Sequence, residues 1–250
     1  MIYPLSEGSF TIGRDKIFVP FDTERDQLTD RPTGSLLVEV QPFLVQLNGE
    51  LLLFDTGLGF SNERGALQLH ENIRAHGFEP EQVAKVMLSH LHKDHAGGLL
   101  RQDGSGGVRP SLLNATYFIY RAEADYALET GYPSYHPAEL EPLFGSGQVH
   151  WLEGGEGYIT DQLSFRHSGG HCPQHIVFFL KDGNQTIFYG GDEAPQLRQL
   201  KVKYVAKYDY DGRRAMMLRE QWAEAGRREG WQFLFYHDIK CPVAMLPPHP

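Results

Sequence analysis

The sequence has few of the features that mark exported, membrane-bound or nucleic-acid-binding proteins. Its two cysteines, Cys172 and Cys241, leave one bridge open but cannot form a disulfide framework, so we expect a cytoplasmic protein. No stretch approaches the roughly eighteen apolar residues of a membrane span, and the N-terminus lacks the basic flank and apolar core of a signal peptide. No run of lysine and arginine stands out against a formal net charge of −9. We therefore expect neither a membrane nor a nucleic-acid partner.

What the chain does contain suits a compact protein with one core. Its 250 residues are 41% hydrophobic, and this length fits a single domain spanning residues 1–250. Short apolar runs alternate with helical patterns, and the two-residue turn Asn48-Gly49 predicts a hairpin. The apolar runs cover residues 10–19, 36–47, 50–55, 83–88, 115–120, 148–152, 163–167, 175–181, 185–189 and 231–236, and the helical patterns cover 63–76, 122–130 and 213–228. This order predicts an α/β protein with two sheets packed face to face and helices outside, a four-layer αββα sandwich.

The densest chemical signal is the decapeptide 89–98, Ser-His-Leu-His-Lys-Asp-His-Ala-Gly-Gly. Four potential metal ligands fall within six positions: His90, His92, Asp94 and His95. Because an extended backbone alternates faces, the first three can point the same way. His95 breaks the alternation, which indicates a turn that directs a fourth donor into the same space. The donor types predict a zinc site with an open position and a second metal nearby.

Further candidate ligands follow later strands. A glycine-flanked loop contains His167, His171 and His175, Asp192 follows a Gly-Gly turn, and His237 follows the last predicted strand. A motif at the end of a strand, entering a loop, is where sites in α/β proteins usually lie. Because one short motif cannot hold two metals, we expect these loops to supply the missing ligands.

Taken in order, these motifs resemble those of the metallo-β-lactamase superfamily over roughly residues 36–237. The motifs that match are Asp55-Thr-Gly after a strand, His-x-His-x-Asp-His at 90–95, the histidine in the glycine loop, Asp192 and His237. In the glycine loop, His171 matches the family's ligand and His175 would be a packed residue. The resemblance implies two zinc ions per chain, or iron or manganese, with His90, His92 and His171 on one, Asp94, His95 and His237 on the other, Asp192 bridging both, and Asp55 supporting a ligand from behind.

The implied activity is hydrolysis of a lactone or ester carbonyl in a small-molecule substrate by a metal-activated hydroxide. Asp94 would carry the proton to the leaving group. The pattern is nearest to the compact N-acyl homoserine lactonase-like and glyoxalase II-like members. Those lactonases often have a tyrosine three residues after the bridging aspartate, where this chain has Pro195. A thioester hydrolase, an iron-dependent oxidoreductase similar to persulfide dioxygenases, and a metal-stabilised binding module stay open as alternatives, as does a homodimer.

Two aromatic segments are expected to be solvated. One is residues 132–136, for which a pocket wall is the alternative. The other is residues 201–210, where lysines and tyrosines alternate and an anion-binding rim is the alternative. Five further histidines, which lack ligand-like spacing, are expected to be surface or structural residues: His70, His76, His136, His150 and His249.

Overall fold

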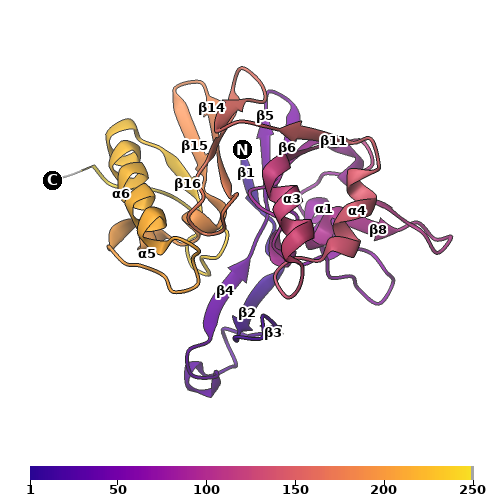
Figure 1. Ribbon diagram of the computed structural model, residues 1–250, viewed down its shortest axis with the longest axis horizontal. Helices are drawn as coiled ribbons and strands as arrows, with labels where there is room; N and C mark the ends of the chain where they lie inside the picture. Colours follow the sequence, from indigo (N-terminus) through magenta and orange to yellow (C-terminus); the bar gives the residue numbers. More distant parts are fainter. Residues whose placement is uncertain (249–250) are drawn as a thin grey trace.

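Two mixed β-sheets packed face to face, with helices on both outer faces, form the body of the protein. The structure is a computed structural model that describes residues 1–248, so His249 lies outside the described part. Figure 1 shows the layers in sequence from the α6 side to the α1, α3 and α4 side. The four-layer αββα sandwich expected from the sequence is confirmed.

The first sheet places four parallel strands at its centre and one side. Its six strands run in the order β1 (Ile2–Pro4), β5 (Phe43–Leu47), β6 (Glu50–Phe54), β7 (Val83–Met87), β10 (Thr116–Tyr120) and β11 (Val149–Leu152). The β5–β6 hairpin turns at Asn48 and Gly49, which have φ values of +50° and +83°. Because β6, β7, β10 and β11 are parallel, their carboxyl ends meet at one edge of the sheet.

The second sheet is largely antiparallel. Its order is β12 (Glu156–Tyr158), β13 (Leu163–His167), β14 (Ile176–Asp182), β15 (Gln185–Tyr189), β16 (Gln232–Leu234) and β17 (Val243–Met245). The strands β15 and β16 are parallel neighbours, so the segments that follow them leave the sheet side by side. A backbone hydrogen bond of 3.0 Å from Ile176 N to Ser89 O joins the two sheets at the edge where these segments emerge.

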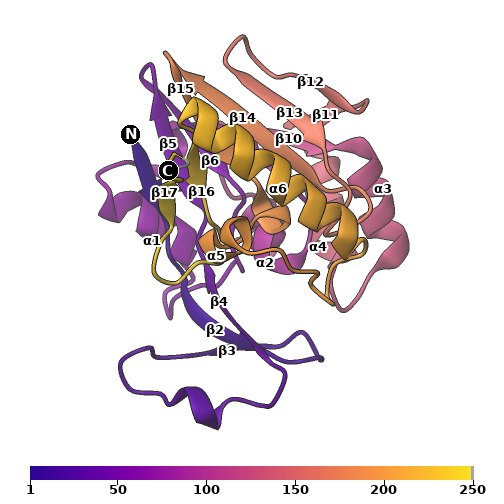
Figure 2. The same ribbon diagram turned by 90° about the vertical axis from the view of Figure 1, so that its left-hand side faces the viewer.

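The helices cover the outer faces unequally. On the first sheet lie α1 (Gln68–Ala75), α3 (Arg121–Thr130) and α4 (Pro137–Phe144); on the second lie α5 (Leu197–Lys201) and α6 (Gly212–Glu229), which crosses it diagonally in Figure 2. Short helical turns are α2 (Lys93–Ala96), η1 (Leu28–Asp30), η2 (Pro80–Gln82), η3 (Gly97–Leu99) and η4 (Gly191–Glu193). The Asp211 side chain caps the start of α6, and Gly230 ends that helix in the left-handed conformation. Within residues 1–248, no helix combines the length and apolarity needed to cross a membrane.

The period-two alternation of the strands separates the core into layers. Along β5, Phe43 and Val45 pack between the two sheets, whereas Leu44 packs under the helices of the first sheet. Along β15, Tyr189 faces the inter-sheet layer and Phe188 packs against α6. Both faces of β5 and of β15 are therefore largely buried, which explains the continuous apolar runs in these two segments.

A small third sheet forms an arm that projects below the body in Figures 1 and 2. It contains β3 (Phe18–Pro20), β2 (Gly8–Ile12) and β4 (Leu36–Val40), and a separate two-stranded ribbon pairs β8 (Leu100–Gln102) with β9 (Val108–Pro110). Two of the expected apolar runs do not form single strands. Residues 10–19 contain the β2–β3 hairpin, and the run 36–47 is split between two sheets. The split falls at Gln41-Pro42, where proline cannot donate to a ladder and the Gln41 amide bonds the carbonyls of Phe235 and Asp238.

Other expected elements are present with shifted ends. The helical pattern 63–76 forms a helix only from Gln68, because the Asn62 carboxamide accepts from the backbone of Arg64 and Ala66 and closes a turn there. The helix Pro137–Phe144 has no counterpart among the predicted elements.

One buried histidine of the fold is unusual in its surroundings. His70 on α1 is 4% exposed, and its Nε2 has no hydrogen-bond partner within the described residues. Burial, followed by the charges of Arg101 and Arg74, lowers the pKa of His70 to about 4. The unfolded chain therefore binds this proton more readily than the folded chain does, so stability is lost as the pH falls from about 6.5 towards 4.

Replacing this histidine should flatten the acid side of the stability curve. Between pH 7 and pH 5, the unfolding free energy of His70→Leu should fall by up to about 2 kcal/mol less than that of the parent chain. Urea unfolding at fixed metal concentration measures this difference, and His150→Leu, at an exposed position, is the control. Equal pH slopes for His70→Leu and the parent would contradict the assignment.

Candidate metal centre

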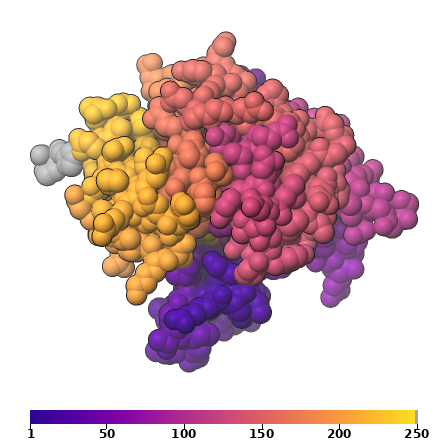
Figure 3. All heavy atoms as spheres, viewed as in Figure 1, coloured from indigo at the N-terminus to yellow at the C-terminus, as the bar shows by residue number. Residues whose placement is uncertain are grey.

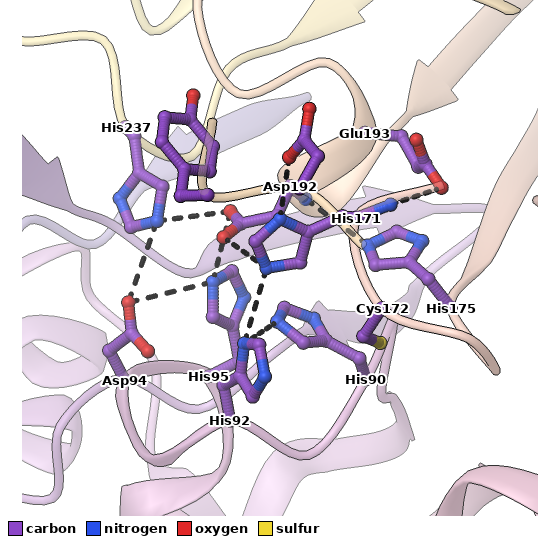
Figure 4. A network of polar contacts seen from close by, with 12 residues as sticks. His90, His92, Asp94, His95, His171, Cys172, His175, Asp192, Glu193 and His237 are labelled. Carbon is purple, nitrogen blue, oxygen red and sulfur yellow. Dashed lines mark hydrogen bonds and ion pairs between the residues drawn. The ribbon is translucent and has the colours of Figure 1, made fainter. Parts of the chain in front are cut away.

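The segments that leave four strand ends converge on one cluster of histidines and carboxylates (Figure 4). These segments follow β6, β7, β15 and β16, and the loop before β14 adds a fifth. Every ligand expected from the sequence lies in this cluster: His90, His92, Asp94, His95, His171, Asp192 and His237. The outcome follows from the topology, because parallel neighbours deliver their loops to the same edge of a sheet.

One group of donors contains three imidazoles and one carboxylate. The candidate ligand atoms of His90, His92, His171 and Asp192 all lie within 4.8 Å of one another. His90 Nε2 is 2.9 Å from His92 Nδ1, and His171 Nε2 is 3.2 Å from that same nitrogen. His171 Nε2 is also 3.2 Å from Asp192 Oδ2.

A second group lies on the other side of Asp192. Asp94, His95 and His237 bring their candidate ligand atoms within 4.8 Å of one another. Asp192 Oδ1 is 3.2 Å from His95 Nε2 and 3.0 Å from His237 Nε2. The two oxygens of Asp192 therefore face different groups, which is the arrangement of a carboxylate shared between two cation sites.

The chemistry of this donor set fits bound cations. Several ring nitrogens turn their lone pairs towards a common space, although an imidazole pair can share only one proton. His95 Nε2 and Asp192 Oδ1 are buried and lie 3.2 Å apart, but neither atom is in hydrogen-bond geometry with a partner within residues 1–248. Unsatisfied buried polar atoms are unfavourable, and coordination of their lone pairs to a metal ion would satisfy both. Imidazole and carboxylate donors suit zinc and related divalent metals.

The donors differ in their protonation preferences. Burial holds the pKa values of His90 and His92 well below the usual histidine value, and neighbouring imidazoles lower them further. Burial works against ionisation of Asp192, but the imidazoles of His237, His95 and His171 keep its pKa well below the usual range. Burial opposes protonation of His95, His171 and His237, but the Asp192 carboxylate raises their pKa values. Positive charge is therefore favoured around Asp192, and a bound cation would supply it and displace these protons.

Asp55 lies behind the cluster, where the sequence analysis places a supporting residue. Its Oδ2 is 2.7 Å from His95 Nδ1 and accepts from the Ser89 hydroxyl at 2.7 Å, while its Oδ1 accepts from the Ser89 backbone N–H. The hydroxyl of Tyr189 also donates to Asp55. With His95 Nδ1 bonded to a carboxylate, its Nε2 is left to face the cluster.

Two residues that fix His171 are not identified from the sequence. Asp209 has a fully buried side chain whose Oδ1 is 3.0 Å from His171 Nδ1. Arg219 on α6 lies 3.7 Å from Asp209 Oδ2 and donates to the backbone carbonyls of Glu193 and Tyr204. A signal for Arg219 was present, because it occupies a core-facing position of an amphipathic helix, four residues after the buried Ala215.

The glycine loop separates its three histidines by role. His171 points into the cluster, whereas His167 bonds the carbonyl of Pro173. His175 is fully buried, and its Nε2 accepts from the backbone N–H of Asp192 at 3.2 Å, as expected for a packed residue.

A cavity of about 160 Å³ opens beside the cluster. The arm supplies an apolar wall, made of Ile12, Phe18, Leu36, Leu37 and Val38. The opposite wall carries Gln199, Tyr204 and Tyr208. Figure 3 shows the indigo arm against the lower side of the body, beneath the junction of its two halves.

Both segments expected to be solvated contribute in part to this region. Tyr135 is 2% exposed and packs on the His92 ring at 4.8 Å, although Tyr132 is 67% exposed. In the second segment the lysines are exposed as expected, but Tyr208 is largely enclosed and hydrogen-bonded to Gln199 at 3.0 Å. The expectation of solvation fails at these tyrosines because each packs against a histidine from a distant segment, Tyr135 on His92 and Tyr208 against His171, with ring centroids 6.1 Å apart in the second pair.

The sandwich and its metal-ligand cluster define a metal-binding α/β protein of hydrolase type. The chain belongs to the metallo-beta-lactamase superfamily, whose family model matches residues 37–228. This confirms the resemblance drawn from the motifs.

Individual relatives are more distant. A ribonuclease, TTHA0252 of Thermus thermophilus, is 28% identical over 177 residues, which is 70% of this chain and 37% of that protein. The N-acyl homoserine lactonase AttM of Agrobacterium fabrum is 28% identical over 118 residues, 44% of this chain and 41% of that protein. The matches thus span less than half of either relative. The solved structure of AidC, a dizinc quorum-quenching lactonase, has the same fold, with a TM-score of 0.71 and 19% identity over 98% of this chain and 89% of that one.

Loss of the carboxylate behind His171 should weaken metal binding. We expect Asp209→Ala to lower zinc affinity about 10-fold to 100-fold, because the freed imidazole loses its orientation, with a smaller loss in Asp209→Asn. Competition with a chromophoric chelator measures the affinity. Asp161→Ala, at an exposed position before β13, is the control. Parent-like affinity in Asp209→Ala would show that the contact has no role in binding.

Proposed function

We propose that the protein is a metal-dependent hydrolase that cleaves a lactone or ester bond with a pair of zinc ions. In this proposal one ion is held by His90, His92 and His171, the other by Asp94, His95 and His237, and Asp192 binds both. The observation that carries the proposal is the division of Asp192, whose two oxygens lie within 3.2 Å of nitrogens from both groups. A bound metal pair supplies Lewis acidity, which polarises a carbonyl and makes water nucleophilic near neutral pH.

The cavity favours a small substrate with an apolar part. The enclosed space, about 160 Å³, accommodates a benzene-sized part of a substrate. The apolar wall suits the acyl or alkyl part of an ester, and the lactonases among the related proteins support this bond type. The related ribonuclease acts on a polyanion, whereas this chain carries a net charge of −9.

Asp94 is placed to move a proton during the cleavage. Its Oδ2 lies 3.5 Å from His237 Nε2 and 3.7 Å from His95 Nε2, and the residue lines the cavity. The carboxylate therefore meets both the candidate ligands and the space that the substrate would occupy. We assign it the transfer of a proton to the departing oxygen.

Tyr208 supplies a hydrogen-bond donor on the opposite wall. Its hydroxyl accepts from Gln199 Nε2 at 3.0 Å and lies 3.2 Å from the Tyr204 hydroxyl. Burial raises the pKa of Tyr208 above its usual value, so the group stays protonated. We expect this O–H to orient the substrate carbonyl, a role that Pro195, also on the cavity wall, cannot perform.

Metal analysis separates the proposal from its alternatives. We expect purified protein to contain about two zinc ions per chain by elemental analysis and to hydrolyse lactones or aryl esters faster than thioesters. One iron per chain with persulfide oxidation would support the oxidoreductase instead. A preference for thioesters would show that the bond cleaved is a thioester, with the same mechanism.

Removal of the shared carboxylate charge should disable the centre. We expect Asp192→Asn to retain less metal and to lose ester or lactone hydrolysis by at least ~100-fold, because loss of even an outer-sphere partner costs 10-fold to 100-fold. Metal content and initial rates are measured together. Asp182→Asn, at the exposed end of β14, is the control. Full activity in Asp192→Asn would show that the bridging role is misassigned.

A further inference from the structure

Two lysines line the cavity without an acidic partner. Lys16 lies in the turn between β2 and β3, Lys93 is the first residue of α2, and both are half-buried. Across the described part of the chain, neither side chain forms an ion pair. The carboxylates on the cavity wall, Asp94 and Asp192, face histidines instead. Because no carboxylate of the described chain pairs with either ammonium group, an anion in the cavity would gain the attraction of both.

Both lysines adjoin the same part of the apolar wall. The Lys93 ammonium lies 5.5 Å from the centroid of the Phe18 ring, and Phe18 follows Lys16 by two residues. The charge of Lys16 also acts on His92, where it contributes to the lowered pKa. The two cations therefore lie near both the apolar wall and the ligand cluster, although they come from separate elements.

The backbone at Lys16 is in a conformation that lysine rarely adopts. Its φ is +59°, and within residues 1–248 only Asn48 and Asp55 share a positive φ among residues other than glycine. Asn48 forms the β5–β6 turn, and Lys16 lies likewise in the β2–β3 turn, where its backbone N–H donates to the carbonyl of Gly13 at 3.3 Å. The turn therefore fixes the backbone from which the Lys16 side chain reaches the cavity.

When metal ions are bound, the cluster is positively charged, and the two lysines add further positive charge beside it. Two divalent cations would exceed the charge of Asp94 and Asp192 by two positive units. Two ammonium groups beside such a centre repel it, and repulsion between like charges is stronger in a partly desolvated cavity than in water. An anionic group on the bound substrate would offset this repulsion.

Building on the proposed hydrolysis, we propose that Lys16 and Lys93 bind a carboxylate of the substrate. The substrate is then an ester or lactone with an apolar segment and a carboxylate that is separate from the bond being cleaved. The apolar segment contacts the wall around Phe18, the carbonyl faces the histidine cluster, and the carboxylate lies between the two ammonium groups.

A matched pair of esters tests this inference. The neutral probe is 4-nitrophenyl hexanoate, and the charged probe is mono-4-nitrophenyl adipate, which has the same chain length with a terminal carboxylate. We expect the parent enzyme to have a lower KM for the adipate ester, and this preference to shrink as salt concentration rises.

The variants separate binding of the charge from general damage. We expect Lys16→Met/Lys93→Met to lower kcat/KM for the adipate ester about tenfold or more, mainly through KM, because hydrogen bonds to charged groups are lost. The hexanoate ester should change less than about threefold, since its contacts are apolar. Lys207→Met removes an exposed lysine outside the cavity and should leave both esters unaffected. Equal losses for both esters, or no loss for the adipate ester, would overturn the inference.

Direct binding keeps this test separate from the proposed function. Adipic acid monoanilide and hexanoic acid anilide carry the same groups without a reactive ester, and calorimetry measures their affinity. If the parent hydrolyses neither ester, the proposed function fails, yet tighter binding of the monoanilide that is lost in Lys16→Met/Lys93→Met still supports the lysine site. Equal affinity for both anilides would refute that site even if both esters are cleaved.

Discussion

The contact between Asp192 and imidazoles from two sides is the interaction on which the site depends. A buried carboxylate is unfavourable unless positive charge or strong donors surround it, and here His95, His171 and His237 do so. The turn that presents it is equally constrained. Gly191 has a φ of +48°, and a Cβ on it would lie 2.6 Å from the Ser89 hydroxyl. His175 accepts from the backbone of Asp192, so the position of this carboxylate is set by packing before any metal binds.

The outer layers of the fold reach the centre through hydrogen bonds. Arg219 extends inward from α6, contacts Asp209 and donates to the backbone carbonyl of Glu193, the residue after Asp192. One helix therefore supports two candidate ligands, His171 and Asp192. On the other side, Glu123 of α3 accepts from the backbone of Leu91, between two ligand histidines. The sandwich therefore holds the cluster from both faces, and damage to a helix is expected to appear as altered metal binding.

The cavity is lined partly by strand ends of the two large sheets and partly by segments outside them. The cluster occupies strand ends, which the architecture itself brings together. The apolar wall and Lys16 come from the three-stranded arm, and the tyrosine wall comes from the segment between α5 and α6. Because the arm and this segment lie outside the two large sheets, they can vary without disturbing the core, and we expect them to determine the substrate.

The sequence by itself determined the layered fold and a complete set of candidate ligands. It could do so because buried strands appear as continuous apolar runs and each ligand lies directly beside a strand or a glycine turn, both of which are local patterns. The resemblance selected His171 in the glycine loop, and the structure places it in the cluster. Only the tertiary structure decided that Asp209 and Arg219 lie behind His171 and that Tyr208 and two lysines line the cavity. These features depend on contacts between distant segments, and a polar residue in a loop gives no local sign of which segment will bury it.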